Sequence, residues 1–146
     1  MVLATYHEAP FASRGLRNFD RVNASASALV EQFDVRTPSI ETPVKSLSGG
    51  NKQKVIVARE LSEDKALVVA SQPTRGVDVG SIEFIHRQLV AARDKGAAVL
   101  LVSAELDEIF GLADRIAVIF EGRIVAVVDP TTTTREQVGV FMAGGT

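Results

Sequence analysis

A short run of small and polar residues, Leu47-Ser48-Gly49-Gly50-Asn51-Lys52-Gln53-Lys54, offers the chemistry of anion binding. A helical pattern follows it, so its two glycines stand at the N-terminus of a predicted helix. Backbone N–H groups in the first turn of a helix have no partner within the helix, and the helix dipole favours negative charge there. The Ser48 hydroxyl adds one more donor. The run therefore predicts either a phosphate-binding turn or a plain turn that caps a helix.

Two further segments stand next to apolar runs. Gln72-Pro73-Thr74-Arg75-Gly76-Val77-Asp78 follows the apolar run at residues 66–70, which predicts a buried strand. Val102-Ser103-Ala104-Glu105-Leu106 follows a second predicted strand at residues 98–102. The three segments occur in this order along the chain.

Together the three segments resemble the ATP-binding cassettes of ABC-type ATPases. Residues 47–54 are similar to the signature of that family, residues 66–78 to its Walker B strand, Pro-Thr turn and D-loop, and residues 102–106 to the segment that carries its switch histidine. The match is strongest with the second cassette of fused, double-cassette ATPases that serve bacterial sugar and nucleoside importers. The resemblance therefore implies the C-terminal part of such a cassette.

Three positions depart from the pattern of the family. Ser71 stands where the Walker B strand ends in Asp, Gln72 where the catalytic Glu follows, and Ala104 where the switch His is expected. A hydroxyl lacks the charge with which a carboxylate holds Mg²⁺, and a charge-assisted contact is worth about 1.5–3 kcal/mol. Gln cannot accept a proton from water, a loss of about 10²–10⁴-fold in rate. We therefore expect that the catalytic residues are lost and that this chain alone is inactive as an ATPase.

A phosphate-cradling G-x-x-x-x-G-K-[ST] loop is also missing, because no Gly-Lys dipeptide occurs in the sequence. The resemblance implies ATP and Mg²⁺ in the full assembly, and neither is expected to be bound to this chain alone. It also implies that Ser48, Gly49, Gly50 and Asn51 bind the γ-phosphate of ATP in trans, on a partner cassette. Asp78, in the D-loop, is expected at the interface between the two cassettes.

The partners implied by the resemblance are the N-terminal cassette of the same protein and membrane-spanning permease subunits. The implied location is cytoplasmic, peripheral to the inner face of the cell membrane. A function of a different class stays open, namely a stand-alone, non-catalytic interaction or regulatory protein with an ABC-like fold. If the codons upstream of Met1 do not encode a Walker A loop in frame, this second function is favoured.

The elements that must position these residues alternate between helices and strands. Residues 1–46 are expected to be a helical (signature) subdomain portion, and residues 47–146 the C-terminal part of a RecA-like α/β core with a parallel sheet. After a helix around residues 22–33, the predicted order is helix 51–61, strand 66–70, helix 81–95, strand 98–102, helix 104–113, and strands 116–120 and 124–128. Ser103 is the candidate N-cap of the helix at 104–113.

The fold class is thus a partial P-loop NTPase-like α/β domain from which the Walker A strand is absent. By analogy with the family, that strand belongs between the strands at 98–102 and 116–120. Unpaired strand edges favour self-association, so we expect either a homo-oligomer or a disordered C-terminal third.

Composition excludes several other classes of function. The 16 Lys and Arg residues face 18 Asp and Glu residues, which leaves a net charge of -2 and no field that attracts nucleic acid. This balance disfavours the roles in DNA repair or translation that some ABC ATPases have. With no cysteine and only His7 and His86 as histidines, neither a metal site nor a disulfide framework is expected.

Overall fold

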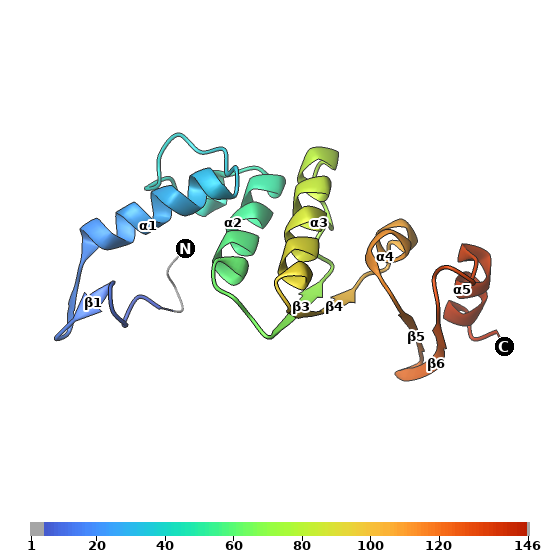
Figure 1. Cartoon of the computed structure of the whole chain (residues 1–146). Coiled ribbons are helices and arrows are strands. Elements are labelled where there is room, and N and C mark those ends of the chain that lie inside the picture. Colours follow the sequence, from blue (N-terminus) through green and yellow to red (C-terminus); the bar gives the residue numbers. More distant parts are fainter. Residues whose placement is uncertain (1–4, 146) are drawn as a thin grey trace. The chain divides into compact units, whose positions relative to one another are not determined.

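The computed structural model describes residues 5–145 and shows helices that alternate with short strands (Figure 1). The elements are β1 (Ala12–Ser13), β2 (Leu16–Arg17), α1 (Phe19–Gln32), a 3₁₀ turn (Val44–Ser46), α2 (Gly49–Leu61), β3 (Leu67–Ser71), α3 (Val79–Asp94), β4 (Ala98–Val102), α4 (Leu106–Leu112), β5 (Ile116–Phe120), β6 (Arg123–Val128) and α5 (Arg135–Met142). Within the described residues, no helix combines the length and the apolar character needed to cross a bilayer.

The chain divides into two compact units. The first extends to Val68 and includes Pro73–Val99, and the second comprises Val69–Gln72 and all described residues from Leu100 onward. The boundary between the units crosses both β3 and β4. The predicted boundary at residue 46 concerns subdomains of the family fold, and it stays a prediction.

In the first unit, α1 is the helix that the apolar spacing predicts. Asn18 caps it by accepting a hydrogen bond from the Arg21 N–H at 3.0 Å. The helix ends at Gln32, and its C-cap is Phe33, which is 1% exposed. A short antiparallel hairpin of β1 and β2 precedes the helix and was not expected. Arg14 and Gly15 form its turn, both with positive φ, a conformation that glycine adopts without steric cost.

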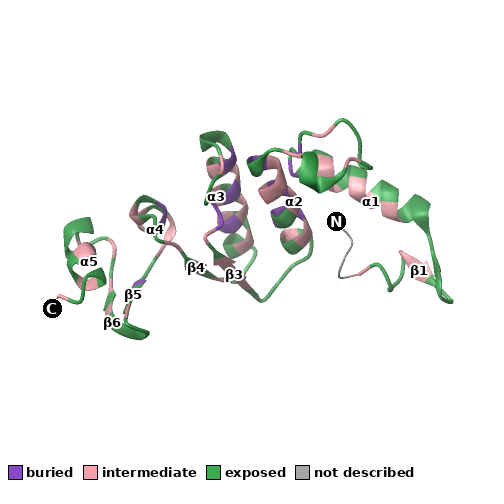
Figure 2. Ribbon diagram, turned by 180° about the vertical axis from the view of Figure 1, so that it is seen from behind, coloured by how far each residue is buried: buried purple, intermediate pink, exposed green. Residues whose placement is uncertain are grey.

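The core of the first unit lies where α2 and α3 pack side by side, and Figure 2 shows buried positions on both helices. Apolar residues at helical spacing supply it, because each helix must bury its apolar stripe. The buried apolar residues of this unit are Phe33, Val35, Val57, Ala58, Ile85, Leu89 and Ala97.

The strands β3 and β4 form a two-stranded sheet. The Ala98 N–H donates to the Ala66 carbonyl at 2.9 Å, and the Gln72 N–H donates to the Val102 carbonyl at 2.7 Å. Because the two starts and the two ends of the strands pair with each other, the strands are parallel, as predicted.

In the second unit, the last two predicted strands are present as β5 and β6, and they pair as an antiparallel hairpin. Ile116 and Val118 pack with Val138 of α5 into a small core. Helix α5 was not predicted, although Thr134 and Gln137 form a capping box that the sequence spacing contains. The expectation of a disordered C-terminal third is therefore wrong, because the capped helix α5 and the paired strands β5 and β6 lie in that part of the chain.

The sheet of β3 and β4 and the sheet of β5 and β6 are separate in the described part of the chain. Leu100 and Val102 are 54% and 45% exposed, as expected for strands that lack a covering layer.

Candidate functional site

Ser48 forms the turn that begins α2. Its backbone is extended, with φ -62° and ψ 161°, and its Oγ accepts a hydrogen bond from the Asn51 N–H at 3.4 Å. The Ser48 carbonyl accepts the first helical hydrogen bond, from the Lys52 N–H at 2.9 Å. The N–H groups of Gly49 and Gly50 lie before that bond, in the first turn, where a helix offers donors to an anion. Ser48 and Gly49 are exposed, so this turn is open to the solvent.

Gly50 is buried against the turn that begins α3. A Cβ added at Gly50 would collide with Ser81 Oγ and Asp78 Oδ2 and would lie 3.1 Å from Ser81 Cβ. At Gly49, an added Cβ would lie 3.0 Å from the Gly76 carbonyl oxygen. Both glycines are therefore needed for close packing, and the structure brings the predicted signature residues directly to the predicted D-loop residue, Asp78.

Asp78 is the N-cap of α3. Its carboxylate accepts hydrogen bonds from the Ser81 N–H at 3.0 Å and from the Ser81 hydroxyl at 2.9 Å. These bonds, the one from the hydroxyl first, lower the pKa of Asp78. The Asp78 side chain therefore carries its negative charge near neutral pH, at an exposed position beside the signature turn.

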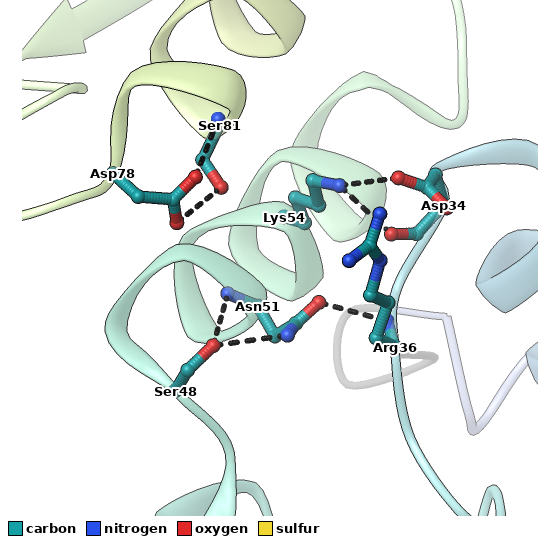
Figure 3. A network of polar contacts seen from close by, with 7 residues as sticks. All are labelled: Asp34, Arg36, Ser48, Asn51, Lys54, Asp78 and Ser81. Atoms are coloured by element: carbon teal, nitrogen blue, oxygen red, sulfur yellow. Dashed lines mark hydrogen bonds and ion pairs between the residues drawn. The ribbon is translucent and has the colours of Figure 1, made fainter.

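A polar network joins the signature helix to the loop that follows α1 (Figure 3). The Arg36 N–H donates to Asn51 Oδ1 at 2.7 Å, and Asn51 Nδ2 donates to Ser48 Oγ at 2.9 Å. One turn further along α2, Lys54 Nζ donates to the Asp34 carbonyl oxygen at 2.9 Å and to Asp34 Oδ2 at 2.6 Å. These hydrogen bonds hold α2 and the loop after α1 together at the turn formed by residues 48–51, the signature turn.

Sequence reasoning overlooked Lys54 and its partner. Lys54 is 6% exposed, and its Nζ lies 4.9 Å from the centroid of the Phe84 ring. The helical spacing of the sequence could have indicated that Lys54 is buried, because Lys54 shares a helical face with three buried residues, Gly50, Val57 and Ala58. A lysine in the apolar stripe of a helix indicates a buried, paired cation.

The remaining predicted positions, Ser71, Gln72 and Ala104, belong to the second unit. Ser71 ends β3 and is exposed, and Ala104 is exposed in the link between β4 and α4. Gln72 has φ 49°, a left-handed conformation that is uncommon for residues other than glycine. None of these three side chains carries a carboxylate, so none can supply a charged oxygen ligand to Mg²⁺.

The prediction that Ser103 caps the following helix is wrong. The N-cap of α4 is Glu105, and no side-chain hydrogen bond caps this helix. The Ser103 Oγ instead accepts a hydrogen bond from the Glu105 N–H at 3.0 Å. This local bond forms a turn ahead of the helix, which is a common alternative for serine.

The network predicts an acid-sensitive first unit. The hydrogen bond from Lys54, followed by its positive charge, lowers the pKa of Asp34, and Ser81 lowers that of Asp78. A carboxyl whose pKa is lower in the folded state adds stability above its unfolded pKa and loses that contribution as the pH falls. We expect the free energy of unfolding, measured by urea denaturation, to decline from about pH 5 to about pH 3. Lys54→Met should make this decline shallower. A free energy of unfolding of the wild type that stays unchanged across that range would contradict the lowered pKa values of Asp34 and Asp78.

No family model matches the sequence. The nucleoside import ATP-binding protein NupA of Lactococcus lactis subsp. cremoris is 48% identical over 145 residues, which are 99% of this chain and 29% of the relative. The guanosine import ATP-binding protein NupO of Bacillus subtilis is 49% identical over 146 residues, 100% of this chain and 29% of the relative. The glucose import ATP-binding protein TsgD13 of Haloferax volcanii is 46% identical over 96% of this chain and 26% of the relative. The chain thus spans less than a third of the length of these relatives.

Two solved structures share the fold. The dimeric structure of the bacterial ABC transporter cassette MJ0796 matches 81% of this chain and 51% of that chain, with a TM-score of 0.66 and 22% identity. The cassette MJ1267 in its ADP conformation matches 93% of this chain and 53% of that chain, with a TM-score of 0.62 and 21% identity. These matches confirm the predicted fold. The chain belongs to the ATP-binding cassettes of ABC transporters, and it corresponds to a part of one.

Proposed function

We propose that the chain is part of the second, degenerate cassette of an ATP-binding subunit that energises import of a sugar or a nucleoside. The names of the relatives support this class of transported solute, since they include nucleoside, guanosine and glucose import proteins. The partners are the N-terminal cassette of the same subunit and membrane-spanning permease subunits. The assembly lies at the cytoplasmic face of the cell membrane.

The proposed task of the chain is to complete the ATP site of the partner cassette in trans. The observation that carries this proposal is the packing of Gly50 against Asp78 and Ser81, which holds the signature turn and the D-loop together in one unit. Ser48 presents its hydroxyl, and Gly49 and Gly50 present their N–H groups, to the phosphate oxygens of that nucleotide. When bound in the assembly, ATP supplies the reactive phosphoanhydride bond and Mg²⁺ neutralises phosphate charge.

This chain's own residues are not expected to hydrolyse ATP. Ser71 cannot supply a charged ligand to Mg²⁺, Gln72 cannot act as a base, and Ala104 has no group for a γ-phosphate. The exposed turn at Ser48 does not depend on these three residues, because it belongs to the other unit. A cassette can therefore lose its own catalytic groups and still serve its partner.

Removal of the Ser48 hydroxyl tests this function. In the complete importer, with its permease in lipid vesicles, Ser48→Ala should lower ATP turnover by about 10–100-fold, because a hydrogen bond to a charged group is worth about 1.5–3 kcal/mol. Solute uptake should fall in parallel. The measurement is phosphate release under saturating solute, normalised to folded protein.

Thr134→Ala is the matched control, because Thr134 caps α5 through its side chain as Ser48 caps α2. Both substitutions remove a capping hydroxyl, which costs about 1 kcal/mol of stability. Only Ser48→Ala should change ATP turnover. Equal turnover in the two variants would show that the signature turn does not serve ATP, and a non-catalytic interaction role would then be favoured.

A further inference from the structure

The orientation of the Asn51 amide is determined by its neighbours. A backbone N–H group can only donate, so the Asn51 atom that faces the Arg36 N–H at 2.7 Å is the oxygen, Oδ1. The other end of the amide is then the –NH₂ group, which also can only donate. It lies 2.9 Å from Ser48 Oγ, which must therefore accept (Figure 3).

Ser48 Oγ thus accepts from Asn51 twice, from Nδ2 at 2.9 Å and from the backbone N–H at 3.4 Å. A hydroxyl has two lone pairs and one proton. With both lone pairs directed at Asn51, the proton points away from that residue. Ser48 is exposed, so its proton faces the surroundings of the turn, where an anion is favoured.

The loop that carries Arg36 is held in place by Lys54. The Lys54 side chain is 8% exposed, and its ammonium group binds both the carbonyl and the carboxylate of Asp34. Val35, between Asp34 and Arg36, is buried at 6% exposure. The position of the Arg36 N–H is therefore fixed relative to α2, and so is the amide that it orients.

We propose that Asn51 is a positioning residue that presets the Ser48 hydroxyl as a hydrogen-bond donor to a phosphate oxygen. Each polar atom of its side chain already makes one hydrogen bond, Oδ1 with the Arg36 N–H and Nδ2 with Ser48 Oγ, so in this proposal Asn51 acts through Ser48, in place of the direct phosphate contact that the resemblance implies. The inference rests on the proposed function and deepens it. Ser48, Gly49 and Gly50 then contact the phosphate, and Asn51 orients the hydroxyl of Ser48.

Asn51→Asp provides the sharpest test, because Asp has the same shape but no –NH₂ group. One carboxylate oxygen still accepts from Arg36, while the other attracts the Ser48 proton toward residue 51 and turns the donor away from the phosphate. Asn51→Ala leaves the hydroxyl free to rotate. We expect ATP turnover of the complete importer to fall in the order wild type, Asn51→Ala, Asn51→Asp, with a loss of about 10-fold or more in the last.

A purely structural role for Asn51 predicts the opposite order of the two variants. Asn51→Ala loses two hydrogen bonds, whereas an acidic residue in the first turn of a helix is stabilising. The thermal midpoint should therefore be lower in Asn51→Ala than in Asn51→Asp. If turnover follows the thermal midpoint, with Asn51→Ala the poorer variant, the proposal is wrong.

A measurement without nucleotide tests the hydrogen bond through which Asn51 acts on Ser48, the relay that the proposal requires. In ¹⁵N–¹H NMR spectra of the 146-residue chain, Ser48→Ala should shift the side-chain amide signals of Asn51, and Thr134→Ala should not. Unshifted amide signals in Ser48→Ala would overturn the relay even if Ser48 is needed for turnover. Shifted signals together with normal turnover in Ser48→Ala would instead overturn the proposed function, and the donor role with it.

Discussion

Replacing Phe33 with alanine is expected to lower the free energy of unfolding by about 3–5 kcal/mol, since a buried aromatic side chain leaves a cavity that the surroundings only partly fill. Phe33 is 1% exposed, and its ring meets the Phe84 ring at a centroid distance of 6.3 Å and an angle of 69°. A domain is stable by only about 5–15 kcal/mol, so a loss of this size removes a large share. The midpoint of urea denaturation, followed by circular dichroism, measures it.

Phe19→Ala is the matched control, because Phe19 is the first residue of α1, the helix that Phe33 follows as C-cap, but is 65% exposed. Removal of an exposed side chain usually changes stability by no more than about 0.5 kcal/mol. Equal losses in the two variants would contradict a core centred on Phe33. They would indicate that α1 contributes through its helix propensity alone.

Gly50→Ala is expected to destabilise the first unit by about 1–3 kcal/mol, as overpacking of a close contact does. The new methyl group cannot be placed without moving the side chains of Asp78 and Ser81. These side chains are hydrogen-bonded to each other, so the N-terminus of α3 must shift as well. We also expect ATP turnover of the complete importer to fall further than the loss of folded protein explains.

Gly111→Ala shows what the same substitution does in a helix where there is room. Gly111 lies in α4, and an added Cβ there meets no other atom within 4 Å. Alanine is favoured over glycine in a helix by about 0.5–1 kcal/mol, so this variant should gain stability. A Gly50→Ala variant as stable as Gly111→Ala would mean that Gly50 is not packed against Asp78.

The repeating apolar patterns predicted most of the elements well. The strands at 98–102 and 116–120 were predicted with the bounds of β4 and β5, because short apolar runs between polar turns leave little freedom in their limits. Helix α5 lacked a comparable pattern, and only its capping box indicated it. Beginnings of helices were less certain, as the wrong assignment of Ser103 illustrates.

The site was predicted as a set of residues but not as an arrangement. The sequence placed Ser48 and the two glycines at a helix start, which the structure bears out. The contacts of Gly50 with Asp78, and of Arg36 with Asn51, join parts of the chain that lie far apart in sequence. No periodic pattern contains such contacts, because they depend on how α2 packs against α3 and against the loop after α1.

The close fit of Gly50 against Asp78 and Ser81 also bears on how the signature turn and the D-loop move. With no room for even a methyl group between Gly50 and the start of α3, we expect a shift of one loop to displace the other, so that the two move together. The conformational entropy of ordering them is lost during folding, not during docking. A partner that binds one loop therefore meets the other already in position, and displacement of either loop is transmitted mechanically to its neighbour.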